Sequence, residues 1–296
     1  MAKKHDKEQR LDLLGFGEIP LREVSGLAIA TLREGQYLVA VGDHGPNVAV
    51  AAITGKAKEP LGDWDVIDVS TLEAPAGSPQ VEQAEAVAAD GVRQAMVLIE
   101  DPALLLVLDT AEPRITHAYA LDGGSHEGLG DTWRDDAASR GEGMVLLRDG
   151  HVLIVKEKRP AGLLEFGPEG DVAHGVSAQT LHPAGEAWAA PDATRLVGLA
   201  WWPAPDALAD LSDAEVGPDQ ALYLLSDQTN AVAQLSLPLA VGDEVAYDAV
   251  WRLPREVGKA EGLTFLPDGT ALVAVDQRAK GRYLATLPPL DQWPRV

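Results

Sequence analysis

Short apolar runs separated by turn residues follow one another along the whole chain, and none has the spacing of an amphipathic helix. Residues 260–277, AEGLTFLPDGTALVAVDQ, are representative. Two apolar runs flank the Pro-Asp-Gly sequence at 267–269, which is a turn signal typical of a β-hairpin. Glu261 and Asp276 then lie at the open end of this hairpin, fifteen residues apart. The pattern predicts an all-β protein.

The same hairpin, with an acidic position at each end, is repeated in five places along the chain. The residues at the first position are Glu23, Glu85, Glu142, Val197 and Glu261. The residues at the second position are Asp43, Glu100, Glu157, Asp227 and Asp276. The first copy has a longer turn than the others. The fourth copy begins with residues 196–203, LVGLAWWP, and has valine in place of the first acid.

The repeat length predicts the architecture. The first positions recur at intervals of 55 to 64 residues, which leaves room for four strands and their turns. Four-stranded units of this size, repeated around an axis, are typical of a β-propeller. We therefore expect a loose segment at residues 1–10 and a single propeller domain over residues 11–296, with five blades and six as the alternative. Residues 10–17, RLDLLGFG, are expected to complete the last blade and close the ring.

Composition narrows the classes of partner. The net charge of −22 argues against a nucleic-acid partner, which requires clustered Lys and Arg. The absence of cysteine excludes disulfides and thiolate metal sites, and the seven histidines lack the spacing of a zinc motif. No apolar stretch has the length of a membrane span or the form of a signal peptide. We expect a cytoplasmic monomer that binds a small molecule or a protein and does not bind a membrane.

In a propeller, the start of each first strand and the end of each second strand lie at the same end of the axis. The acids at these positions therefore converge, and they cannot all ionise unless something neutralises them. Calcium, which takes six to eight oxygen ligands, is one candidate. Basic side chains from the loops after the second strands are another, namely His44, Lys158, Arg159 and Arg278. In a third interpretation, the acids accept hydrogen bonds from the backbone of the neighbouring blade and hold the ring together.

A long connection at residues 121–143, LDGGSHEGLGDTWRDDAASRGEG, is expected to cross the acid-bearing end. Loops of this length in compact repeats frequently cover a site. His126, Trp133 and Arg134 are its candidate ligand contacts, and a solvated excursion is the alternative.

Several of these motifs resemble a known family. The sequence Ser25-Gly26-Leu27, the Glu-Gly pairs at 142–143 and 261–262, VKEKR at 155–159 and LYLLSDQTN at 222–230 resemble the SdiA-regulated propeller family. They are also similar to the esterase-like phytase and the strictosidine-synthase or gluconolactonase groups. The resemblance implies a propeller with calcium in an axial acidic pocket and, in some relatives, hydrolysis of phosphoesters or lactones.

On this basis we expect a metal-dependent hydrolase of a small phosphoester, ester or lactone. The expected metal ligands are Glu23, Glu85, Glu142 and Glu261. Glu142 or Glu261 would serve as general base, and Arg159 and Arg278 would hold an anionic substrate. Further ligand contacts are expected from His44, Glu157, Lys158, Asp227, Asp276, His126, Trp133 and Arg134. The alternative is a non-catalytic propeller whose calcium is structural and whose loops bind a protein or a small ligand, and a third hypothesis is a cyclase or isomerase.

Overall fold

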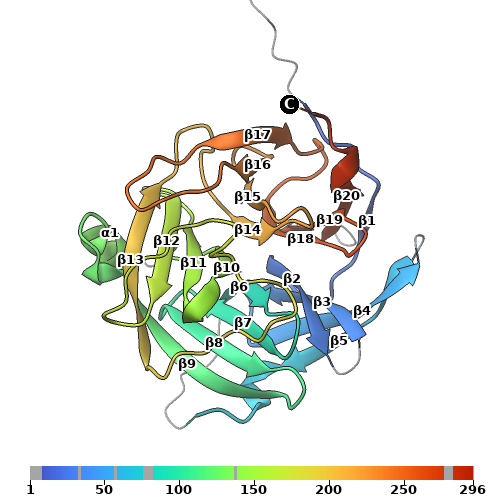
Figure 1. The fold of residues 1–296 in the computed structure, drawn as a ribbon. Coiled ribbons are helices and arrows are strands. Elements are labelled where there is room, and N and C mark those ends of the chain that lie inside the picture. Colours follow the sequence, from blue (N-terminus) through green and yellow to red (C-terminus); the bar gives the residue numbers. More distant parts are fainter. Residues whose placement is uncertain are drawn as a thin grey trace, which may run out of the picture.

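Twenty β-strands make up most of the computed structural model, which describes residues 9–32, 35–56, 59–75, 83–136, 139–276 and 283–295. The strands pair into antiparallel groups of four that are arranged around a central axis (Figure 1). This arrangement confirms the all-β propeller predicted from the sequence.

The strands are grouped in chain order. The first unit contains β2 (Val24–Leu32), β3 (Gly35–Gly42), β4 (Asn47–Lys56) and β5 (Glu59–Asp68). The second contains β6 (Ala84–Ala89), β7 (Gln94–Ile99), β8 (Leu104–Asp109) and β9 (Arg114–Asp122). The third contains β10 (Gly143–Leu146), β11 (Val152–Lys156), β12 (Gly162–Gly167) and β13 (Arg195–Pro203). The fourth contains β14 (Asp213–Val216), β15 (Leu222–Ser226), β16 (Ala231–Leu235) and β17 (Tyr247–Arg252). The fifth contains β18 (Ala260–Phe265), β19 (Thr270–Val275), β20 (Leu284–Pro289) and β1 (Gly15–Gly17).

The described helices are short. They are η1 (Val69–Thr71), η2 (Gly123–Ser125), α1 (Gly130–Asp135), η4 (Arg148–Gly150) and η5 (Leu290–Gln292). The outermost strands of the second and third units, β9 and β13, pair in parallel and join these two units into one eight-stranded sheet.

The hydrophobic core lies between the units. Each inner strand contacts the inner strands of both neighbours, and the contacts run from β2 through β6, β10, β14 and β18 back to β2. Five clusters of buried apolar side chains each combine residues of two adjacent units. The ring is therefore held together by burial of apolar surface at every junction.

The N-terminal segment closes the ring as predicted. β1 pairs antiparallel with β20, with Gly15 opposite Thr286 (Figure 1). Before β1, Leu11 is buried against the junction of the fourth and fifth units, and its N–H donates to the carbonyl of Arg252. The last unit therefore combines strands from both ends of the chain, and β20 is paired on both of its sides. Residues 1–8 lie outside the described part of the chain.

The assignment of the fourth unit from the sequence was wrong. Residues 196–203 belong to β13, the outermost strand of the third unit, and the inner strand of the fourth unit is β14. β13 is a long outer strand, and its apolar residues Leu196, Ala200 and Trp202 are buried in the junctions between units. This burial explains why an outer strand has an apolar sequence. β14 is short and carries two acids, so its hydrophobic pattern is too weak to be recognised as a strand.

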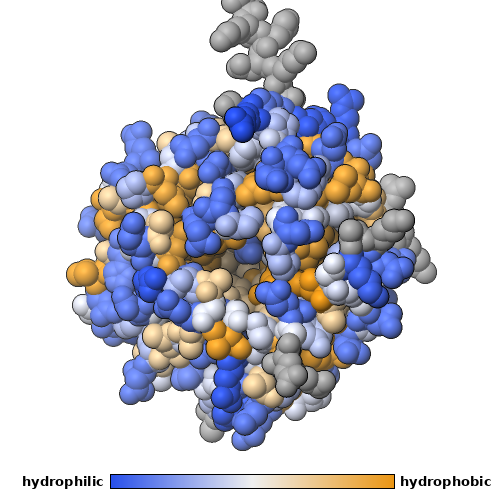
Figure 2. All heavy atoms as spheres, turned by 45° about the vertical axis from the view of Figure 1, so that its right-hand side comes forward, coloured by the Kyte–Doolittle hydropathy of each residue, from blue (hydrophilic) through white to orange (hydrophobic). Residues whose placement is uncertain are grey.

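No helix in the described residues is long and apolar enough to cross a membrane. Hydrophilic side chains cover most of the face shown in Figure 2, with apolar patches between them, as expected for a chain with a net charge of −22.

Candidate functional site

The strand register defines one axial position in each unit. In the fifth unit the second acid is Asp276, and Ala274, two residues before it, pairs with Gly262 of the inner strand. The residue that directly precedes Gly262, which is Glu261, occupies what we call the axial position. The same pairing identifies one axial residue in each of the other four units. The five residues at this position are Ser25, Glu85, Glu142, Ser212 and Glu261. We call Glu85, Glu142 and Glu261 the axial glutamates.

The structure corrects two of the first acidic positions that were predicted from the sequence, Glu23 and Val197. Glu23 lies two residues before the axial position, which Ser25 occupies, because the first hairpin has a different length from the others. Its side chain is exposed and lies 3.3 Å from Nδ1 of His44. Val197 belongs to β13, and Ser212 occupies the axial position of the fourth unit.

Close packing of the inner strands explains the glycine in the Glu-Gly pairs. A Cβ atom on Gly143 would lie 2.7 Å from Cα of Asp213, in the neighbouring inner strand. A Cβ atom on Gly262 would lie 3.1 Å from the backbone nitrogen of Leu27. The glycines therefore allow adjacent units to approach, while the glutamate before each of them remains at the axial end.

The axial glutamates influence one another electrostatically. Burial, followed by the charges of Asp43, Glu100 and Glu261, raises the pKa of Glu85 to about 8, and a hydrogen bond with Ser25 opposes this shift. Burial and the charge of Asp227 raise the pKa of Glu261 to about 8 as well.

The pKa of Glu142 is raised by the same two causes, burial and neighbouring carboxylates. Burial and then the charges of Glu85, Glu100, Glu157 and Glu261 raise the pKa of Glu142 well above its usual range. Within the described residues, none of the axial glutamates forms an ion pair. The positive charge of Lys259 opposes the shift at Glu261 without cancelling it, so a proton or a bound cation would stabilise these carboxyl groups further.

The second acids have partners of two kinds. Glu157 forms an ion pair with Lys158, and Asp276 forms one with Lys259. Glu100 accepts a hydrogen bond of 3.0 Å from the backbone N–H of Arg140, and its pKa is raised to about 7, chiefly by burial.

Asp227, like Glu100, is a carboxylate that accepts backbone hydrogen bonds from the next unit. Burial raises its pKa, and hydrogen bonds from the backbone N–H groups of Ala260 and Lys259 oppose the shift. Glu100 and Asp227 thus link neighbouring units through backbone hydrogen bonds, the role that the third interpretation of the acids gives them. Asp43 is half-buried, and its charge raises the pKa of Glu85.

The other expected ligand residues are dispersed. Arg159 is exposed directly after Lys158, and Arg278 lies outside the described residues. In the loop before β10, Trp133 is buried against Phe166 with ring centroids 5.3 Å apart, so it packs in the core and is not available as a binding surface. Arg134 is exposed and pairs with Asp131.

His126 lies at the end of η2, and its Nδ1 is buried without a hydrogen-bond partner among the described residues. The loop that carries these residues places α1 at the periphery of the ring, beside β13 (Figure 1). The end of the same loop is fixed near Glu100 by buried Lys156, whose Nζ lies 3.1 Å from Oγ of Ser139.

Sequence reasoning missed Ser25 and Ser212, and it also missed two acids of β14. Asp213 is buried and accepts a hydrogen bond of 2.6 Å from the backbone N–H of Leu263. Glu215 accepts one of 3.0 Å from the hydroxyl of Thr264, and burial raises its pKa to about 8. Both acids therefore link the fourth and fifth units.

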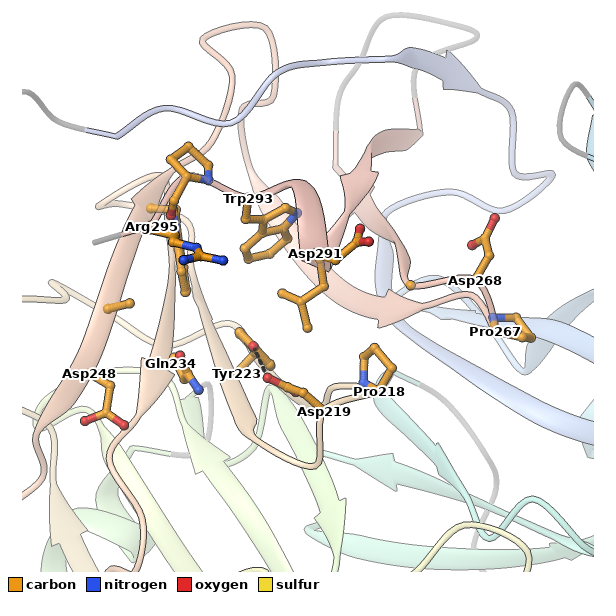
Figure 3. A pocket seen from close by; sticks show the side chains of 15 residues that line it. Pro218, Asp219, Tyr223, Gln234, Asp248, Pro267, Asp268, Asp291, Trp293 and Arg295 are labelled. Atoms are coloured by element: carbon orange, nitrogen blue, oxygen red, sulfur yellow. Dashed lines mark hydrogen bonds between the residues drawn. The ribbon is translucent and has the colours of Figure 1, made fainter.

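A separate cavity of about 790 Å³ lies between the fourth and fifth units. Its lining includes Asp219, Tyr223, Asp268 and Trp293, and the hydroxyl of Tyr223 donates to Asp219 over 2.9 Å (Figure 3). Asp219 and Asp268 are in hairpin turns at the end of the strands opposite the axial glutamates. This cavity is therefore distinct from the axial position.

The donor set of the axial position suits a hard cation, because it consists of carboxylate and hydroxyl oxygens. The closest triads of candidate ligand atoms in the described chain are elsewhere, at Glu23, Asp43 and His44 and at His151, Glu165 and His174. A cation bound by the axial glutamates would therefore draw their carboxylates together or complete its ligand shell with water.

Comparisons with known proteins address the fold. No family model and no curated protein matches the chain. Among solved structures, glutaminyl cyclase of Myxococcus xanthus is 11% identical, with a TM-score of 0.52 over 95% of this chain and 96% of that protein. A streptogramin B lyase is 12% identical, with a TM-score of 0.47 over 94% of this chain and 97% of the lyase.

A third similar structure is aldose sugar dehydrogenase of Streptomyces coelicolor in its PQQ-bound form. It is 13% identical, with a TM-score of 0.44 over 94% of this chain and 96% of the dehydrogenase. The likeness to glutaminyl cyclase is one of fold alone, and none of the three likenesses extends to a particular activity. The resemblance to the SdiA-regulated and phytase-like families has no support from them.

Proposed function

We propose that the axial glutamates form a binding pocket for a divalent cation, with calcium as the preferred ion. The observation that carries the proposal is the contrast between two sets of acids. Glu157 and Asp276 have lysine partners, whereas the axial glutamates have raised pKa values and no ion-pair partner in the described chain. A bound cation would stabilise the ionised form of these buried, mutually repelling carboxylates.

Calcium fits the chemistry of the donors better than a transition metal does. The axial position offers carboxylates from Glu85, Glu142 and Glu261 and hydroxyl groups from Ser25 and Ser212, with no nitrogen or sulfur ligand. Calcium accepts six to eight oxygen ligands in a flexible geometry, and water fills positions that the protein leaves open.

Calorimetric titration with calcium tests this proposal. Because Glu85 and Glu261 have pKa values of about 8, calcium binding at pH 7 must release protons, and affinity must increase from pH 6 to pH 8. Titration in two buffers of different ionisation enthalpy measures the proton release. Glu261→Gln should weaken binding at least tenfold, whereas Asp63→Asn, which alters an exposed acid on β5, should leave it unchanged. Absence of calcium uptake, or equal affinity in Glu261→Gln, would refute the proposal.

The proposed cation pocket could also be the active site of a hydrolase. Lys158 pairs with Glu157 at the axial end, and Arg159 follows it, so cationic groups are available near the pocket for an anionic substrate. A bound cation would polarise a phosphoester, ester or lactone, and one of the axial glutamates would serve as general base. Calcium-dependent turnover of such compounds that is lost in Glu142→Gln is the expected result for an enzyme. Calcium binding without turnover is the result expected for a binding propeller.

A further inference from the structure

A cavity of about 290 Å³ lies at the end of the inner strands opposite the axial glutamates. Every unit contributes to its wall the residue four places after its axial residue, and in four units this is the last residue of the inner strand. The five residues are Ile29, Ala89, Leu146, Val216 and Phe265. The cavity therefore lies on the propeller axis inside a ring of apolar side chains, which we call the apolar ring.

Glu215, which directly precedes Val216 in β14, is the only acid among the described residues that line this cavity, and none of them is Lys or Arg. His182 is the other titratable residue of the wall, and its Nε2 donates to the backbone carbonyl of Glu186 at 2.8 Å. The strand register identifies the equivalents of Glu215 in the other units, which are Ala28, Ala88, Val145 and Thr264. Three of them are small and apolar, so the fold does not require an acid at this position.

The carboxyl group of Glu215 has a partner at one oxygen. Its Oε1 accepts a hydrogen bond of 3.0 Å from the hydroxyl of Thr264. Within the described residues, its Oε2 accepts no hydrogen bond and the carboxyl group forms no ion pair. A largely buried carboxylate is stable when it is paired. Since Glu215 is partly exposed and lines the cavity, a donor that enters the cavity can supply the missing partner.

The chemistry of the wall selects the kind of donor. A bare calcium ion requires several oxygen ligands, and the cavity offers a single carboxyl group among apolar side chains. An organic ammonium ion donates charge-assisted hydrogen bonds to a carboxylate, and its alkyl chain gains from burial against apolar side chains. Because water occupies about 30 Å³ per molecule in the liquid, the cavity has room for a chain of several carbon atoms. The net charge of −22 also favours cations.

We infer that this cavity binds a small alkylammonium ion, with the ammonium group on Glu215 and the alkyl chain inside the apolar ring. This arrangement of one charged group in an otherwise apolar cavity is typical of small-molecule sites. The inference goes beyond the proposed calcium pocket and does not depend on it, because none of the axial glutamates lines the cavity.

Titration of the methyl-labelled protein with n-pentylammonium, followed by NMR, tests this inference. The methyl groups of Ile29, Leu146 and Val216 line the cavity and should shift in a saturable manner. The titration is run at pH 8.5, because burial raises the pKa of Glu215 to about 8 and the ionised carboxylate pairs with ammonium. 1-Pentanol has the same chain without the charge and should bind at least tenfold more weakly.

Two variants locate the binding site. Glu215→Gln removes the charge, retains an oxygen for Thr264 and should weaken pentylammonium binding at least tenfold. Ala89→Leu gives the second unit the residue that Leu146 provides in the third, and should weaken binding to a similar extent by filling the cavity. Asp63→Asn removes an exposed acid of β5 as the charge-matched control and should bind like the wild type, as should Glu142→Gln.

A lysine side chain carries the same alkylammonium group, so Nα-acetyl-lysine methylamide is titrated in parallel. Tighter binding of pentylammonium assigns the cavity to a free amine, and tighter binding of the lysine derivative assigns it to a lysine side chain. If the methyl groups of the apolar ring do not shift, if 1-pentanol binds as tightly as pentylammonium, or if Glu215→Gln retains the wild-type affinity, the inference is wrong.

Discussion

At the scale of single residues, the axial glutamates combine a raised pKa with a position that the fold does not reserve for an acid. Serine occupies the same place in two units, so the strand register is compatible with a neutral side chain. The carboxyl groups of Glu85, Glu142 and Glu261 therefore cost stability when they ionise without a cation. This cost has a measurable dependence on pH.

The free energy of unfolding should decrease as the pH increases from about 5 to about 8 in the presence of a chelator. Folding raises the pKa of Glu261 from its ordinary value to about 8, so the folded protein binds more protons than the unfolded chain in this window. Glu261→Gln cannot ionise and should be more stable than the wild type at pH 8.5 by about 1–2 kcal/mol, allowing for water that screens a half-buried carboxylate. Urea unfolding at pH 5, 7 and 8.5 measures the difference.

Asp63→Asn is the control for this experiment, because it removes an exposed acid and should keep the wild-type pH profile. Equal slopes for the wild type and Glu261→Gln would show that Glu261 is ionised at neutral pH and would remove the electrostatic argument.

The glycine beside Glu142 gives a second prediction at this scale. Gly143→Ala places a methyl group 2.7 Å from Cα of Asp213, in backbone that cannot move away easily. We expect a loss of about 1–3 kcal/mol in the free energy of unfolding, as in other overpacked interiors. Gly15→Ala, where no atom lies within 4 Å of the new methyl group, should change it by less than about 0.5 kcal/mol. Similar effects of the two substitutions would contradict the close approach of β10 and β14.

At the scale of the elements, the N-terminal segment is a structural part of the ring. Leu11 is 3% exposed and packs with Trp251 and Leu253, whereas Leu14, three residues later, is 61% exposed. Leu11→Ala should therefore lower the free energy of unfolding by about 2–4 kcal/mol, and Leu14→Ala should have little effect. Chemical denaturation of the two variants measures this difference, and equal stability would show that the segment does not anchor the last unit.

The strands of a hairpin are predicted correctly from the sequence where both strands are apolar runs. The prediction fails for β14, which is short and carries two acids. The hairpins of β6 with β7, β10 with β11 and β18 with β19 are recognised through their acids fifteen residues apart. The same interval, counted back from Asp227, leads to Ser212 and would have located β14. The apolar run of β13 resembles that of an inner strand, because outer strands of this propeller also bury large side chains at the junctions.

The axial residues and the buried polar contacts are harder to predict from the sequence than the strands are. Ser25 could have been found by aligning Ser25-Gly26 with the Glu-Gly pairs at 142–143 and 261–262. The hydrogen bonds of Glu165 to His151 and to the backbone N–H of His174 depend on how the loop after β12 folds back, and no spacing in the sequence encodes this. Burial of Trp133, a residue of α1, against Phe166 of β12 likewise follows from contacts between distant segments.

At the scale of the whole molecule, the ring separates structural and functional acids. Apolar clusters between adjacent units stabilise the propeller, and acids such as Asp213 and Glu100 link neighbouring units through backbone hydrogen bonds. The axial glutamates have no such partners in the described chain, and they lie where all units meet. We therefore predict that a divalent cation stabilises the entire ring.

Thermal unfolding at pH 8 with a chelator, and then with excess calcium, tests this claim most directly. Calcium at a hundredfold excess over its dissociation constant adds about 2.7 kcal/mol to the free energy of unfolding. We expect the unfolding midpoint to rise by on the order of 5 °C in the wild type and to remain unchanged in Glu142→Gln. A wild-type midpoint that is the same with chelator and with calcium would contradict the account and would leave the axial glutamates as protonated structural groups.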